Sequence, residues 1–130
     1  MKNILVVDND ENITKTIEAA LATNKNYNVD VVYSGMEGLE KMRKGDKKYD
    51  IVLLDLMMPK MSGVEVCQEM NKDEELKKIP VLIVSALPVN SESFQESQGK
   101  FNELDVVKDV LEKPFEVKDL FEKTKKILGE

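Results

Sequence analysis

The fold is decided by one stretch of the sequence, Asp50-Ile51-Val52-Leu53-Leu54-Asp55-Leu56-Met57-Met58-Pro59-Lys60-Met61-Ser62-Gly63. Its aliphatic run, residues 51–54, does not alternate with polar residues, which is typical of a strand covered on both faces of a parallel sheet. Asp55 ends the run, and Pro59 and Gly63 follow it four and eight residues later. Proline and glycine favour turns. The stretch therefore predicts a buried strand, then a turn at the edge of the sheet, then a helix.

Comparable runs recur on both sides of this stretch, separated by segments of helical period. The other candidate strands are residues 4–7, 29–33 and 81–84, with a weaker fifth at 110–111. The intervening segments carry apolar stripes at helical spacing, and two of them begin with a capping box, at Ser34 with Glu37 and at Ser62 with Glu65. Residues 88–108 are polar and predict only an irregular or mobile helix. Strand and helix in alternation predict an α/β fold, a doubly wound five-stranded parallel sheet with helices on both faces.

Composition limits what such a domain can do. At 130 residues the chain is long enough for one domain, and its charge is −6 from 19 basic and 25 acidic residues. The absence of His and the single Cys exclude an imidazole base, a disulfide within the chain and a multi-Cys zinc site. The acidic balance argues against direct nucleic-acid binding. We find no targeting or membrane-spanning segment, and we expect a cytoplasmic protein.

The residues that follow the candidate strands carry the chemistry. In open α/β sheets, ligands bind beyond the carboxyl ends of the strands. Those ends are Asp8-Asn9-Asp10, Asp55, Ser85 and Lys113-Pro114. Clustered carboxylates repel one another, and a hard divalent cation with oxygen ligands, such as Mg²⁺, relieves that repulsion. A carboxylate can also attack phosphorus, while a hydroxyl donates a hydrogen bond to one phosphoryl oxygen and an ammonium group neutralises another. Phosphoryl transfer to a carboxylate is the expected reaction.

These residues closely resemble the receiver domain of the two-component response-regulator (CheY-like) family. The resemblance covers residues 2–128 and rests on the stretch from Asp50 to Gly63, on Ile79–Ala86 and on Glu112–Phe115. It implies a flavodoxin-like strand order of 2-1-3-4-5. It also implies that a sensor histidine kinase, a phosphotransfer protein or a small acyl phosphate phosphorylates Asp55, so that the domain is a signalling phosphoacceptor rather than a turnover enzyme.

The resemblance also assigns roles within the site. It implies that Mg²⁺, with Mn²⁺ as an alternative, is held by Asp8, Asn9, Asp55 and the backbone carbonyl of Met57, with Asp10 as an additional candidate. Ser85, Ala86 and Lys113 would contact the phosphoryl group. Pro59, Gly63 and Pro114 would form the turns that position these groups.

Three departures from the family pattern affect metal binding and output. Asn9 replaces the second of two adjacent acids, which predicts weaker metal binding. Val110 replaces the aromatic residue three positions before the lysine that serves the family as a rotameric switch. Lys113 lies 28 positions after Ser85, which is more than is usual. Met57 and Leu87 are apolar, so neither orients an attacking water, and we expect slow hydrolysis of the acyl phosphate.

Two alternatives stay open at this point. The first is a degenerate receiver that docks to its partner without phosphorylation, which Asn9 and Val110 favour. The second is a haloacid-dehalogenase-like phosphatase with Asp8 as nucleophile and Asp10 as acid and base, which leaves the motif around Asp55 unexplained. For the receiver we expect a stand-alone domain over residues 1–130, with no output domain, that signals through contact with a downstream protein.

Overall fold

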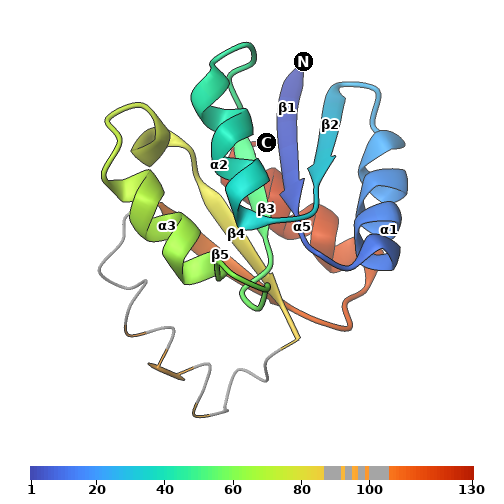
Figure 1. Cartoon of the computed structure of the whole chain (residues 1–130). Helices are drawn as coiled ribbons and strands as arrows, with labels where there is room; N and C mark the ends of the chain where they lie inside the picture. Colours follow the sequence, from blue (N-terminus) through green and yellow to red (C-terminus); the bar gives the residue numbers. More distant parts are fainter. Residues whose placement is uncertain (87–91, 93–94, 97–98, 100–105) are drawn as a thin grey trace.

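The computed structural model describes residues 1–86, 92, 95, 96, 99 and 106–130. Five parallel strands form one sheet in the order β2-β1-β3-β4-β5, as the sequence predicts (Figure 1). The strands are β1 (Lys2–Val7), β2 (Tyr27–Val32), β3 (Ile51–Leu54), β4 (Val81–Ser85) and β5 (Val107–Glu112). Strand β5 is longer than the pair of residues expected, and most of the irregular helix expected over 88–108 lies outside the described residues.

Helices cover both faces of the sheet, which confirms the doubly wound architecture. On one face lie α1 (Glu11–Ala22) and α5 (Val117–Leu128); on the other lie α2 (Gly35–Lys44) and α3 (Gly63–Asn71) (Figure 1). A 3-10 turn, η1 (Leu76–Lys78), leads into β4. Among the described residues, no helix is both long and apolar enough to cross a membrane.

The central strands are apolar throughout because each face has its own core. In β1, Ile4 and Val6 belong to the cluster that includes residues of α1 and α5. Leu5 and Val7 belong to the cluster that includes residues of α2 and α3. All four side chains are at most 1% exposed. Strand residues alternate between the two faces, so a sheet covered on both sides requires apolar residues in succession.

The two serine caps behave differently. At the start of α3 the Ser62 side chain accepts a hydrogen bond from the backbone of Glu65, and the Glu65 carboxylate accepts one from the backbone of Ser62, which completes the predicted capping box. Ser34 also caps its helix through the backbone of Glu37, but the Glu37 carboxylate accepts from the Ser34 hydroxyl instead. The box at Ser34 is therefore only half formed.

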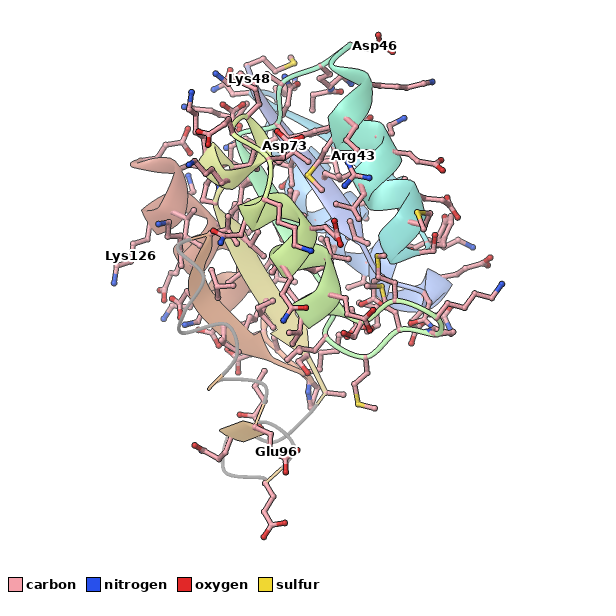
Figure 2. The ribbon with its side chains drawn as sticks, turned by 60° about the vertical axis from the view of Figure 1, so that its left-hand side comes forward. Arg43, Asp46, Lys48, Asp73, Glu96 and Lys126 are labelled. Carbon is pink, nitrogen blue, oxygen red and sulfur yellow. The ribbon has the colours of Figure 1, made fainter. Side chains whose placement is uncertain are left out.

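Helices α2 and α3 lie side by side and are joined by an exposed ion pair. Figure 2 shows Arg43 on α2, and its guanidinium lies 3.6 Å from the Glu69 carboxylate of α3. The stripe on α2 needs one correction. The apolar spacing of the helical segments predicts Met36, Met42 and Met70 in the core, but 51% of Met36 is exposed, whereas Met42 and Met70 are buried. Helical spacing alone cannot show where the sheet stops covering the first turn of a helix.

Candidate functional site

Four polar side chains converge at the carboxyl edge of the sheet. Asp8 follows β1, Asp55 follows β3, Ser85 ends β4 and Lys113 follows β5. These four strands are neighbours in the order β1-β3-β4-β5, so their ends meet at one place. Asp8, Asp55 and Ser85 are all buried. The convergence predicted from the sequence is confirmed for these four residues, whereas Asp10, the third acid at the strand ends, is exposed at the start of α1.

Lys113 joins the two acids. Its ammonium group lies 2.7 Å from Oδ2 of Asp8 and 3.6 Å from Oδ1 of Asp55. Its backbone N–H donates to the carbonyl oxygen of Ser85 at 2.7 Å, and the Lys113–Pro114 peptide bond is cis. The ends of β4 and β5 are thereby tied together, and the lysine extends from β5 across the sheet edge to β1.

Asp55 is electrostatically strained. Burial, as the larger cause, and the negative charge of Asp8 together raise the pKa of Asp55 to about 6. The Lys113 ammonium and the backbone N–H of Met57 act in the opposite direction and lower the pKa. A carboxylate held in this way gains from any added positive charge, which is the condition that a metal-assisted phosphoacceptor needs.

Replacing Asp55 with asparagine should therefore stabilise the protein. Asp55 holds its proton more tightly when folded than when unfolded, so its ionisation penalises the folded state above pH 6 and has no effect below about pH 4. We expect Asp55→Asn to raise the free energy of unfolding by roughly 2 kcal/mol at pH 7.5. Urea titrations at pH 7.5 and pH 4 should show the gain only at the higher value. A gain that is the same at both would mean that charge is not its cause.

Gly63 explains the glycine of the central stretch. A Cβ at this position would lie 2.4 Å from the backbone oxygen of Asp55 and 3.0 Å from the Cα of Leu56. The backbone N–H of Gly63 donates to the carbonyl oxygen of Leu56 at 2.9 Å. The start of α3 therefore packs directly on the chain that carries Asp55, and a side chain here would displace it.

The other residues expected at the site are exposed to solvent. Asn9 and Asp10 are exposed, and Oδ1 of Asp10 accepts hydrogen bonds from the backbone of Asn12 and Ile13 at the start of α1. Met57 places 63% of its surface in solvent, and Ala86, beyond the end of β4, is also exposed. Leu87, the other residue expected to affect hydrolysis, lies outside the described part of the chain.

The donor set fits a hard divalent cation. Within the residues that the structure describes, no group of three His, Cys, Asp or Glu side chains could hold a metal. Asp8 and Asp55 nevertheless supply two buried carboxylates close enough to repel each other. Backbone and amide oxygens complete such sites in proteins, and Met57 and Asn9 are the candidates for those positions.

Comparison with known proteins settles the family. The protein-family model described as the response regulator receiver domain matches residues 4–125 of the chain. The chain belongs to the response-regulator receiver family. It is 33% identical to the response regulator ArlR of Staphylococcus haemolyticus over 128 residues, which are 98% of this chain and 53% of that protein. The chain thus spans about half the length of the curated relatives it matches.

Solved structures agree on the fold. A CheY-like receiver domain protein from Methanospirillum hungatei superposes with a TM-score of 0.82 at 24% identity, covering 99% of this chain and 94% of that one. The receiver domain of a sensor histidine kinase from Pseudomonas aeruginosa, solved with a magnesium ion in its active-site cleft, gives 0.81 at 22% identity, covering 99% and 98%. The family is one of phosphoacceptor signalling modules, so the phosphatase alternative built on Asp8 and Asp10 falls away.

Proposed function

We propose that this receiver accepts a phosphoryl group on Asp55 from a sensor histidine kinase or a phosphotransfer protein and passes the signal on by protein contact. The observation that carries the proposal is the buried Asp55 with Asp8 beside it and the Lys113 ammonium 3.6 Å away. A buried pair of mutually repelling acids bridged by a lysine destabilises the folded state. Such clusters are typical of functional sites, and phosphoryl transfer is a function that uses these groups.

In the proposed reaction, a carboxylate oxygen of Asp55 forms a bond to phosphorus while the bond from phosphorus to the donor breaks. The donor is a phosphorylated imidazole or a small acyl phosphate, and its leaving group departs with the bonding electrons. The Lys113 ammonium neutralises one phosphoryl oxygen, the Ser85 hydroxyl donates a hydrogen bond to another, and Asp8 keeps Lys113 at the edge of the sheet. Mg²⁺, when bound by Asp8, Asp55 and the carbonyl of Met57, supplies positive charge. The magnesium in the Pseudomonas relative supports that cofactor.

Phosphorylation would change the charge balance at the sheet edge. The new group adds about −1.5 to −2 charges beside Asp8. Lys113, now 2.7 Å from Asp8, would turn toward the phosphoryl oxygens. Because the backbone N–H of Lys113 donates a hydrogen bond to the carbonyl oxygen of Ser85, such a movement would affect the ends of both β4 and β5. A surface formed by these strands would then gain or lose a partner protein.

Mass spectrometry of the intact chain tests the proposal. After incubation with acetyl phosphate and Mg²⁺ we expect one phosphoryl adduct, absent from Asp55→Asn and absent when EDTA is present. Melting curves of the variant should show that it is folded. An adduct that persists in Asp55→Asn would contradict the assignment and point to Asp8.

Asn9 and Val110 favour one rival, a degenerate receiver that docks without phosphorylation. The same experiment with Asn9→Asp separates the two. An adduct on the native chain supports the phosphoacceptor. An adduct on Asn9→Asp only would show that the amide disables the metal site, and would favour the docking module.

A further inference from the structure

Strand β2 lies at one end of the sheet, so one of its long edges pairs with β1 and the other faces away from the sheet (Figure 1). In the described part of the chain, no other strand pairs with β2. Its residues 28–31 are partly exposed, whereas every residue of β3 and β4 is buried. An unpaired strand edge is a template on which another strand can form hydrogen bonds. The outer edge of β2 is therefore a candidate interaction surface.

The backbone hydrogen bonds of β2 show which of its groups face outward. The carbonyl oxygens of Asn26 and Val32 accept hydrogen bonds from the backbone of β1 and of the residue that follows it. In a parallel pair, every second residue directs its N–H and C=O at the neighbouring strand. The even-numbered residues of β2 therefore bond to β1, and the N–H and C=O groups of Val29 and Val31 point outward. The C=O of Tyr27 points outward too, while its N–H donates to a carbonyl oxygen of the preceding turn at 3.0 Å.

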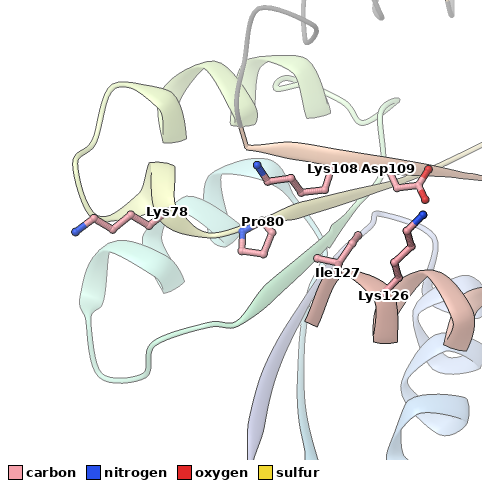
Figure 3. Close-up of a pocket in the computed structure, with 6 residues that line it drawn as sticks. All are labelled: Lys78, Pro80, Lys108, Asp109, Lys126 and Ile127. Atoms are coloured by element: carbon pink, nitrogen blue, oxygen red, sulfur yellow. The ribbon is translucent and has the colours of Figure 1, made fainter. Parts of the chain in front are cut away.

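The strands at the two ends of the sheet differ in the features that hinder edge pairing. Lysines, prolines and bulges protect a strand edge from a second strand. Strand β5 has a bulge, because Val81 pairs with Val107 and Leu82 pairs with Asp109, so that Lys108 has no partner on β4 (Figure 3). Strand β2 contains no lysine or proline, and its register with β1 is continuous. Of the two, β2 has the less protected edge.

We propose that β2 pairs edge to edge, in antiparallel orientation, with β2 of a second copy of this chain, about a twofold axis at Val29. In this register Val29 exchanges both of its backbone hydrogen bonds with Val29 of the second copy. The N–H of Val31 donates to the C=O of Tyr27 in the second copy, and the symmetry repeats this bond. The outward groups of the two strands therefore match, and the two sheets continue into one.

The side chains on the face covered by α1 also match in this register. Tyr27 lies opposite Val31 of the second copy, and the two Val29 side chains meet at the axis. In the single chain, Val29 and Val31 are only partly buried against the core beneath α1. Pairing would cover the apolar surface that they leave exposed, and aromatic side chains opposite β-branched ones stabilise a strand pair.

On the other face, the register places Asn28 opposite Asp30 of the second copy. Within the described residues, the Lys47 ammonium and the Tyr49 hydroxyl both bind Oδ2 of Asp30, at 3.0 and 2.6 Å. Oδ1 is therefore the oxygen that would accept a hydrogen bond from the Asn28 amide. Because Asp30 faces an amide and not a second Asp30, two acidic chains can pair without placing these carboxylates opposite each other. This self-complementarity favours a second copy as the partner.

Sedimentation velocity of the full chain, from micromolar to millimolar concentration, tests the proposal. A strand edge buries less than the roughly 1,600 Å² of a standard interface, so the dimer should be weak and depend on concentration. Amide hydrogen exchange should slow with rising concentration at Val29 and Val31. It should not change at Asn28 and Asp30, whose N–H groups bond to β1.

Two lysine variants make the test specific. Val29→Lys would bring two ammonium groups together at the axis, and we expect it to weaken the dimer by at least about tenfold. Asn28→Lys is the matched control, because it changes the net charge equally at the adjacent position. It places an ammonium group opposite Asp30, and we expect it to tighten the dimer by about fivefold.

Labelling of Asp55 by acetyl phosphate should be the same in both variants, because the dimer does not involve the carboxyl edge of the sheet. Melting curves should show that both variants are folded. A chain that stays monomeric at millimolar concentration would overturn the proposal. Lysine variants that shift the equilibrium in the same direction would do so as well. A dimer in which exchange at Val29 is unchanged would place the interface elsewhere and would also contradict it.

Discussion

Gly63→Ala is expected to lower the free energy of unfolding by about 3 kcal/mol, the upper part of the range for overpacking. The new Cβ would meet the backbone oxygen of Asp55 at 2.4 Å and the Cα of Leu56 at 3.0 Å. Backbone atoms cannot rotate away as a side chain can, so the start of α3 or the chain after β3 must shift. Because that chain carries Asp55, acetyl phosphate labelling should also fall.

Gly35→Ala is the matched control for this change. Both glycines are the first residue of a helix and follow a serine cap, so alanine brings the same gain in helix propensity at each. At Gly35 the new Cβ would meet the side chains of Val66 at 2.7 Å and Met61 at 3.2 Å. Those side chains can move, and we expect a cost under about 1.5 kcal/mol. Urea unfolding of both variants measures the difference in their free energies of unfolding. Equal losses would show that the backbone after β3 can shift to accommodate the new Cβ and would contradict the prediction.

Lys113→Met is expected to destabilise the protein by about 3 kcal/mol at pH 7.5, because it leaves Asp8 and Asp55 buried without their counter-charge. Methionine keeps most of the volume of the lysine side chain, so packing changes little. Lys113 lowers the pKa of Asp55, and without it that pKa rises further above about 6. The deficit is therefore largest above pH 6 and should shrink as the pH falls below 6, because Asp55 is then protonated in the folded state of both the native chain and the variant.

Lys123→Met is the control for a lysine in an ion pair that is not buried. Its ammonium lies 3.0 Å from Asp109, a short ion pair, but both side chains are 33% exposed. A pair that is partly open to solvent is expected to contribute no more than about 1 kcal/mol. Urea titrations at pH 7.5 and pH 5 should show a large and pH-dependent loss for Lys113→Met only. A loss at Lys113 that does not change with pH would mean that packing, not charge, is the cause.

Much of the architecture was predictable from the sequence because burial on two faces leaves a local pattern. The apolar run Ile51–Leu54 predicts a central parallel strand, and the structure places it between β1 and β4. The rule that ligands bind at carboxyl ends brings Asp8, Asp55, Ser85 and Lys113 together before any coordinates are known. The exposure of Met36 could not be predicted, since it depends on where a neighbouring layer ends.

The sequence by itself determined the order of the elements, the two-faced sheet and the set of polar groups at its carboxyl edge, because each of these follows from local periodicity and chain direction. Only the tertiary structure decided how those groups meet. Lys113 lies closer to Asp8 than to Asp55, and Gly63 packs against the backbone of Asp55. The bulge at Lys108 likewise depends on how β5 pairs with β4. Contacts of this kind join residues far apart in the chain, and their distances depend on the packing of the whole sheet.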